Sequence, residues 1–276
     1  MDVKLIALDL DGTLLLPDKT LSPRNRAALE AAAAQGIHLV PTTGRLYEAL
    51  PAVLRELPFI RYAITVNGGQ VYDSATQTVL YTAYLPLELC MRIYDYLDTL
   101  PVLYDCYLDG SAYMRRDFYE QLPEFIYDNP AALQMVQKLR KPVDDFRGLL
   151  LKTGHDLQKL QFFLKNPDDR RALAQALNTR FPETVSSFSM AHNVEVNHRN
   201  ATKGEGVRML CEHLQIPLSQ AACFGDNYND ISMLKTAGIS VAMGNAEPEA
   251  LAAAKFVTTT NAEDGVAQFI ESHFLK

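Results

Sequence analysis

Two acids and a hydroxyl directly follow a short apolar run near the start of the chain. The run covers residues 3–8, broken only by Lys4, and Asp9, Asp11 and Thr13 follow it within the sequence DLDGT. Such a run predicts a strand buried in a parallel sheet, and these folds bind ligands at the carboxyl ends of their strands. An unpaired carboxylate at the end of a buried strand is costly, which favours a chemical role for Asp9. We therefore predict that Asp9 is a nucleophile toward phosphoryl groups and that Asp11 is its acid/base partner.

Three other stretches carry polar residues just after an apolar strand or in the first turn of a helix. They are Thr43 with Gly44, Lys203, and Asp226 with Asn229 and Asp230. In a doubly wound sheet such positions converge on one edge. Converging carboxylates repel each other, by about 4 kcal/mol for two charges ~4 Å apart at an effective dielectric of 20. A divalent cation removes that cost, and a set of oxygen ligands suits Mg²⁺, which is the predicted cofactor.

The same stretches offer groups that bind phosphate. Thr43 supplies a hydroxyl, Gly44 a backbone N–H that a ligand can approach closely, and Lys203 a positive charge. Asn229 supplies an amide at a helix N-terminus, where the helix dipole favours anions. Each stretch alone also fits a turn, a helix cap or a solvated lysine. Only their joint occurrence predicts a phosphate site.

With these residues in view, the chain resembles phosphatases of the haloacid dehalogenase superfamily, in the Cof-like sugar-phosphatase branch. Four motifs carry the resemblance, in the expected order: Asp9-Leu10-Asp11-Gly12-Thr13, Thr43-Gly44-Arg45, Lys203-Gly204, and Gly225-Asp226 with Asn229-Asp230. The resemblance covers residues 1–84 and 193–276. In the middle of the chain it rests only on the position and length of an insert.

The resemblance implies a two-step mechanism. Asp9 attacks the phosphorus of a monoester and forms an aspartyl-phosphate, while Asp11 protonates the leaving alcohol and then deprotonates the hydrolytic water. It further implies that Mg²⁺ is held by the Asp9 carboxylate, the Asp11 carbonyl and Asp226. Ion-pump relatives carry Thr at the position of Asp11, so an Asp there favours rapid hydrolysis.

Other residues are expected around this centre. The transferring oxygens are held by the backbone N–H of Leu10 together with Thr43, Gly44, Lys203 and Asn229. Asp230 is expected to orient Lys203 or a metal-bound water without binding the metal itself. Arg45 and Asn67 lie on loops that face the predicted site and are candidate substrate contacts.

The order of the predicted elements indicates an α/β protein. Strands and helices alternate at both ends of the chain, which predicts a doubly wound parallel sheet of the Rossmann-like type. We also expect a helix over residues 47–56, a strand of the parallel pattern over residues 62–66, a helix over residues 87–97, and a helix from residue 203 that Thr202 and Glu205 cap. The middle reads as an inserted α+β module. We expect a core from residues 1–84 and 193–276, and a cap from residues 85–192. By resemblance, the cap closes over the site and selects the substrate.

Composition excludes several classes of protein. The chain has 276 residues and a net charge of -7, so no overall basic field attracts nucleic acid. No apolar run approaches the ~20 residues that span a bilayer. The four cysteines lack metal-ligand spacing and read as reduced, which favours a cytoplasmic protein. We expect no membrane partner, and a monomer or weak homo-oligomer.

The sequence therefore predicts a Mg²⁺-dependent phosphatase for small phosphorylated metabolites, such as sugar phosphates or phosphorylated cofactors. Two alternatives remain. A phosphomutase or other phosphotransferase uses the same intermediate but passes the group to a sugar. A sensor binds a phosphometabolite without turnover, although the set of Asp9, Asp11, Lys203 and Asp226 argues for chemistry.

Overall fold

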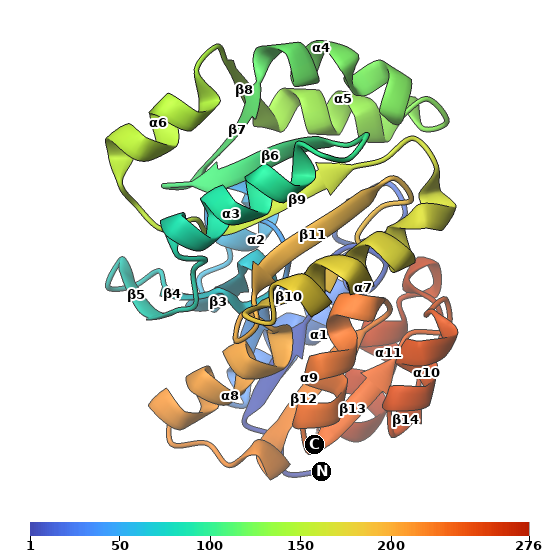
Figure 1. The fold of residues 1–276 in the computed structure, drawn as a ribbon. Coiled ribbons are helices and arrows are strands. Elements are labelled where there is room, and N and C mark those ends of the chain that lie inside the picture. The colour runs from blue at the N-terminus through green and yellow to red at the C-terminus, as the bar shows by residue number, and fades with distance from the viewer. Residues whose placement is uncertain (276) are drawn as a thin grey trace. The chain divides into compact units, whose positions relative to one another are not determined.

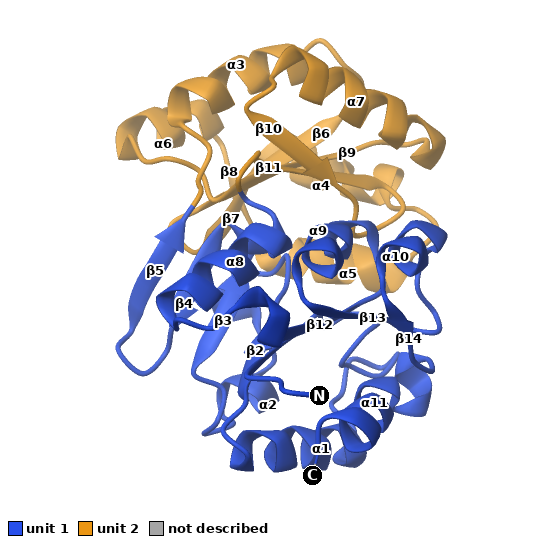
Figure 2. Cartoon of the chain, turned by 90° about the horizontal axis from the view of Figure 1, so that it is seen from below, with its two compact units in different colours: residues 1–82, 201–276 blue, residues 83–200 orange. Residues whose placement is uncertain are grey.

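The chain divides into two compact units. A computed structural model describes residues 1–275, and Figure 1 shows its helices and strands. Unit 1 contains residues 1–82 and the chain from residue 201 onward, and unit 2 contains residues 83–200 (Figure 2). The predicted second boundary, at residue 193, falls earlier than this division because strand β11 (Asn193–His198) completes the sheet of unit 2.

Unit 1 is built on a five-stranded sheet in which all neighbouring strands are parallel. In spatial order its strands are β14 (Phe256–Val257), β13 (Ile239–Ala242), β12 (Ala221–Gly225), β1 (Leu5–Leu8) and β2 (His38–Pro41). Every residue of the central strand β1 is buried, as expected for a strand covered on both faces. The predicted parallel α/β core is confirmed.

Helices cover both faces of this sheet. Ile6 and Leu8 of β1 pack in a cluster with helices α1 (Pro23–Ala34) and α11 (Gly265–His273). The alternate residues Leu5 and Ala7 pack on the other side with helices α8 (Lys203–His213) and α9 (Ile231–Thr236). The remaining short elements of this half of the chain are η4 (Leu218–Gln220), η5 (Tyr228–Asp230), α10 (Pro248–Ala253) and η6 (Asn261–Glu263). This alternation gives the layers helix, sheet, helix.

Two local expectations for the first part of the chain differ from the structure. Strand β3 (Tyr62–Thr65) meets the end of β2 through a parallel bridge between Thr42 and Ile64, but its ladder partners are the antiparallel strands β4 (Gln70–Asp73) and β5 (Thr78–Thr82). The backbone turns back through η2 (Val66–Gly68), where Val66 and Asn67 have positive φ.

The second is a helix expected over residues 47–56, which is split into η1 (Tyr47–Ala49) and α2 (Ala52–Arg55). Leu50 is extended because it precedes Pro51.

Unit 2 is an α+β unit built on a six-stranded sheet, mainly antiparallel. Its strands in spatial order are β10 (Thr184–Ser187), β11, β9 (Lys159–Phe163), β6 (Leu103–Leu108), β7 (Ser111–Arg115) and β8 (Arg140–Val143). One face packs on α3 (Leu87–Leu97), α6 (Phe146–Thr153) and α7 (Arg170–Arg180), the last preceded by η3 (Pro167–Asp169). Residues of the other face pack with α4 (Arg116–Phe125) and α5 (Pro130–Leu139).

No helix within residues 1–275 combines the length and the apolar character that crossing a bilayer requires.

Candidate functional site

The turn after β1 carries the first motif. The N–H of Asp9 donates to the carbonyl of Phe224 on β12, at 3.1 Å, which extends the parallel pairing by one residue. The chain then closes a tight loop, in which the N–H of Leu14 donates to the Asp9 carbonyl at 3.2 Å. Gly12 permits this loop because its φ is +93°, a conformation that side chains disfavour. Asp9 is thereby fixed at the carboxyl end of the sheet's central strands.

Lys203 lies between two carboxylates. Its Nζ is 2.5 Å from Oδ1 of Asp9 and 2.5 Å from Oδ1 of Asp230, and its side chain is fully buried. Although burial disfavours an ammonium ion, the carboxylates of Asp230 and Asp9 raise the pKa of Lys203. The lysine is therefore a fixed positive charge beside the predicted nucleophile.

Helix α8 begins at this lysine, and two features hold the helix start in place. The hydroxyl of Thr202 accepts the N–H of Glu205 at 3.2 Å, which is the predicted cap of α8. Gly68 lies directly against the carbonyl of Thr202, where any Cβ would overlap it. A close approach of the β3–β4 turn to the helix start thus fixes where Lys203 enters the site.

Both carboxylate oxygens of Asp230 have hydrogen-bond partners in the protein. Its Oδ1 contacts Lys203, and its Oδ2 accepts the backbone N–H groups of Asp226 and Asn227, each at 2.9 Å. Asp230 is therefore placed to orient both Lys203 and the loop that carries Asp226. This geometry is compatible with the orienting role predicted for Asp230.

Three carboxylates form one buried cluster. Each of Asp9, Asp226 and Asp230 offers an oxygen within 4.8 Å of the others. The hydroxyl of Thr13 donates to Oδ1 of Asp226 at 2.7 Å. The missing side chain of Gly12 leaves the space that the Asp226 carboxylate occupies. The first and fourth motifs, more than two hundred residues apart in the chain, thus form one site.

The charges of this cluster are not balanced by protein groups alone. Burial and the nearby Asp230 raise the pKa of Asp226 to about 6. Burial, followed by the charge of Asp230, also raises the pKa of Asp9. A divalent cation would remove this repulsion, and hard carboxylate oxygens are the ligands that Mg²⁺ prefers. The donor set fits such an ion.

The second motif is joined to the fourth through Asn67. Its backbone N–H donates to the carbonyl of Thr43 at 3.0 Å, and its Oδ1 accepts Nδ2 of Asn229 at 3.1 Å. The hydroxyl of Thr43 accepts the N–H of Arg45 at 3.2 Å. The structure therefore links Thr43, Arg45, Asn67 and Asn229 in one loop network, with Gly44 within the same turn.

Asp11 has cationic partners of its own. Arg45 contacts both carboxylate oxygens, with its Nη2 2.7 Å from each. Lys19 adds a contact of 3.0 Å to Oδ1. Burial alone would raise the pKa of Asp11, but the charges of Arg45 and Lys19 lower it below its ordinary value. Arg45 thus binds the predicted acid/base residue, a contact that sequence reasoning did not anticipate.

Three contributing residues were not assigned roles from the sequence. They are Thr13, which contacts Asp226, Lys19, which contacts Asp11, and Asn245, whose Nδ2 donates to the Gly12 carbonyl at 2.8 Å. Thr13 lies inside the first motif and Asn245 follows the end of β13, so the positions of both residues in the sequence could have marked them as site candidates. Lys19 lies in a polar loop, and nothing in the sequence marks it as a site residue.

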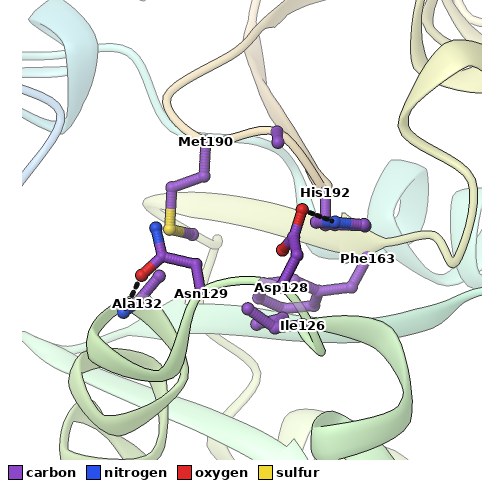
Figure 3. Close-up of a pocket in the computed structure, with 8 residues that line it drawn as sticks. Ile126, Asp128, Asn129, Ala132, Phe163, Met190 and His192 are labelled. Atoms are coloured by element: carbon purple, nitrogen blue, oxygen red, sulfur yellow. Dashed lines mark hydrogen bonds and ion pairs between the residues drawn. The ribbon is translucent and has the colours of Figure 1, made fainter.

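Unit 2 has a pocket of about 140 Å³ of its own, shown in Figure 3. Phe163 and Met190 contribute to its apolar wall, and Asp128 lies 3.1 Å from Nε2 of His192. None of the predicted site residues lines it. The chemistry-bearing cluster and this pocket are therefore separate features.

Comparisons with known proteins identify the family of this chain. Residues 6–270 match the family described as haloacid dehalogenase-like hydrolases, and the chain belongs to that family. The family predicted from the four motifs is confirmed, and the chain is a phosphoric monoester hydrolase.

Individual relatives cover the whole chain. The pyridoxal phosphate phosphatase YbhA of Escherichia coli (strain K12) is 30% identical and aligns over 100% of both chains. The 5-amino-6-(5-phospho-D-ribitylamino)uracil phosphatase YcsE of Bacillus subtilis (strain 168) is 27% identical, over 98% of this chain and 95% of its own. A solved haloacid dehalogenase-like hydrolase from B. subtilis is 28% identical, covers 99% of this chain and 100% of its own, and superposes with a TM-score of 0.83.

Proposed function

We propose that the chain is a Mg²⁺-dependent phosphatase that hydrolyses small phosphorylated metabolites through an aspartyl-phosphate on Asp9. The observation that carries this proposal is the buried cluster of Asp9, Asp226 and Asp230 around the ammonium of Lys203. A purely structural role does not explain three carboxylates and one lysine at the end of buried strands, because the cluster keeps an uncompensated negative charge. A nucleophile, a cation and a phosphate dianion together account for it.

Each residue has a distinct task in the proposed reaction. Asp9 attacks phosphorus in line, the bond from phosphorus to the leaving oxygen breaks, and Asp11 gives that oxygen a proton. Water then attacks the aspartyl-phosphate, Asp11 takes the proton from this water, and phosphate and free Asp9 result. Lys203 neutralises charge on the transferring oxygens, assisted by Thr43, Asn229 and the N–H groups of Leu10 and Gly44.

Mg²⁺ would be held by the carboxylates of Asp9 and Asp226 and by the carbonyl of Asp11, where it would shield the nucleophile from the phosphate charge. Asp230 positions Lys203 and the Asp226 loop, since both of its oxygens already have protein partners. Among the described residues this leaves Asp9 and Asp226 as the carboxylates of the cluster that are available to the ion.

Sugar phosphates and phosphorylated cofactors are the proposed substrate class. The relatives named for pyridoxal phosphate and for a phosphoribitylamino-uracil both act on small phosphate monoesters, which supports this class. We further propose that unit 2 acts as a cap that selects among such substrates. Action in the cytoplasm and a monomeric or weakly associating state stay predictions.

The test is phosphate release from a panel of phosphorylated metabolites, with Mg²⁺ and with EDTA. The panel includes pyridoxal phosphate, several sugar phosphates and 4-nitrophenyl phosphate. We expect release only with Mg²⁺, and loss of release in the isosteric variant Asp9→Asn. Full activity of Asp9→Asn would contradict the proposal. Transfer of the phosphoryl group to an added sugar in preference to water would instead indicate a phosphomutase.

A further inference from the structure

Arg45 binds Asp11 at two points and is itself held by the protein. Its Nε lies 3.0 Å from Oδ2 of Asp11, and its Nη2 lies 2.7 Å from each carboxylate oxygen. A guanidinium in this fork arrangement fixes the plane of the carboxylate as well as its distance. Asp11 therefore has a defined orientation, although its side chain is 37% exposed.

The backbone around Arg45 explains why the guanidinium is fixed. The N–H of Arg45 donates to the hydroxyl of Thr43 at 3.2 Å, and its carbonyl accepts the N–H of Val66 at 3.0 Å. Its Nη1 donates to the carbonyl of Ala49 at 3.4 Å. Each guanidinium nitrogen thus has a protein partner, an arrangement that suits a support for Asp11 better than a direct ligand of substrate.

Lys19 differs from Arg45 in how firmly it is held. Its Nζ is 3.0 Å from Oδ1 of Asp11, but its side chain is 56% exposed and extends from a surface loop. An exposed lysine contact of this kind is weak and exchanges readily with solvent. Loss of this contact frees one side of Oδ1, while Arg45 still holds both oxygens of Asp11.

We propose that Arg45 is the positioning residue for the acid/base Asp11, and that Lys19 is the contact which gives way to substrate. This inference rests on the proposed function. Asp11 must reach the leaving oxygen to give its proton, and then the hydrolytic water to take one back. Both transfers need a carboxyl oxygen within about 3 Å of its target. Arg45 orients the Asp11 carboxylate. Release of Lys19 from Oδ1 lets the substrate and the water approach that oxygen.

Removal of Arg45 should therefore affect esters according to their leaving group. An alkyl phosphate needs a proton on the departing oxygen, whereas 4-nitrophenolate departs without one. The measurement is kcat/KM, which reports the first chemical step, for 4-nitrophenyl phosphate and for the alkyl phosphate that the unaltered chain hydrolyses fastest.

For Arg45→Gln we expect kcat/KM to fall about 10- to 100-fold with the alkyl phosphate, and by no more than about threefold with 4-nitrophenyl phosphate. Arg45→Lys should lose less kcat/KM with the alkyl phosphate than Arg45→Gln does, because an ammonium keeps one contact with Asp11. Lys19→Gln should not lower kcat/KM for the alkyl phosphate, because its contact has to give way before Asp11 reaches the leaving oxygen; a loss as large as that of Arg45→Gln would overturn the assignment of Lys19.

Arg61→Gln is the matched control. Arg61 also binds a carboxylate at two points, with contacts of 3.0 and 2.7 Å to Asp73, but at the opposite end of β3. We expect both esters to be hydrolysed as by the unaltered chain. Thermal unfolding of each variant in Mg²⁺ shows whether the fold is retained.

Three results would overturn the inference. Equal losses with both esters would mean that Arg45 acts on the phosphate group common to them. Unchanged hydrolysis by Arg45→Gln would mean that Asp11 needs no positioning. If the unaltered chain released phosphate from neither ester, the proposed function would fail and the inference with it.

Discussion

Replacing Asp226 by Asn should make the metal-free protein more stable while removing its response to Mg²⁺. Asp226 is 8% exposed and lies in the carboxylate cluster of unit 1. Its pKa is raised to about 6, first by burial and then by Asp230. At pH 7.5 the folded chain therefore holds an ionised carboxylate in surroundings that favour the protonated form. Asn has the same shape without the charge.

The expected gain in the free energy of unfolding follows from the raised pKa of Asp226. A rise from the ordinary value of 3.8 to about 6 corresponds to about 3 kcal/mol, at 1.36 kcal/mol for each pH unit. The Oδ1 of Asn can still accept the hydroxyl of Thr13, but its amide nitrogen must be placed among buried neighbours, which costs about 1 kcal/mol. The net gain is about 2 kcal/mol, or roughly 4–8 °C in Tm for a unit of this size.

The assay is thermal unfolding of both chains in EDTA and in saturating Mg²⁺. In EDTA we expect Asp226→Asn to melt above the unaltered chain. In Mg²⁺ only the unaltered chain should become more stable. Its free energy of unfolding should rise by about 2.7 kcal/mol at a Mg²⁺ concentration of 100 Kd. Asp2→Asn, at an acid whose side chain is 69% exposed, is the control and should change neither value. A lower Tm of Asp226→Asn in EDTA would show that the Asp226 charge does not destabilise the metal-free fold, and an unchanged Mg²⁺ response would show that Asp226 is not a ligand.

Three further predictions concern the same cluster. Thr13→Val removes the hydroxyl that orients Asp226 and should weaken Mg²⁺ binding about 10- to 100-fold by titration calorimetry; an unchanged Kd would show that this hydrogen bond does not matter. Because protons compete with the metal for Asp226, the Mg²⁺-induced rise in Tm should be smaller at pH 5 than at pH 8, and equal rises would count against Asp226 as a ligand. Gly12→Ala forces a side chain into a positive φ and against the Asp226 carboxylate, so it should lower the Tm by several degrees and abolish the Mg²⁺ response; a variant that melts like the unaltered chain would contradict the geometry of the loop.

The core sheet could be predicted because its signals are local. The apolar run that forms β1 has no polar face, so it identifies a strand buried on both sides. Helix α3, over Leu87–Leu97, has the predicted bounds because its apolar periodicity is clear. The antiparallel pairing of β3 could not be predicted. It depends on a reversal at Val66 and Asn67, both at positive φ, which no hydrophobic pattern marks.

The grouping of site residues was predictable for a similar reason. Asp9, Lys203 and Asp226 each sit at the end of a strand or the start of a helix, and the topology of a parallel sheet brings such positions together. Individual side-chain partners were not predictable. Arg45 is 34 residues from Asp11, and nothing in the motif says which of several carboxylates it binds. That choice depends on where the loop after β2 ends, which only the folded backbone determines.

In the proposed mechanism Asp9 carries the phosphoryl group during turnover. The most direct measurement is to quench Asp11→Asn with substrate and Mg²⁺, reduce with borohydride and analyse the peptides by mass spectrometry. Asp11→Asn is suited to this because it slows hydrolysis of the intermediate more than its formation from an ester with a good leaving group. We predict reduction to homoserine at residue 9, dependent on substrate and Mg²⁺ and absent from Asp9→Asn. Turnover of substrate with no modification at residue 9, or with the phosphoryl group on another side chain, would contradict the account.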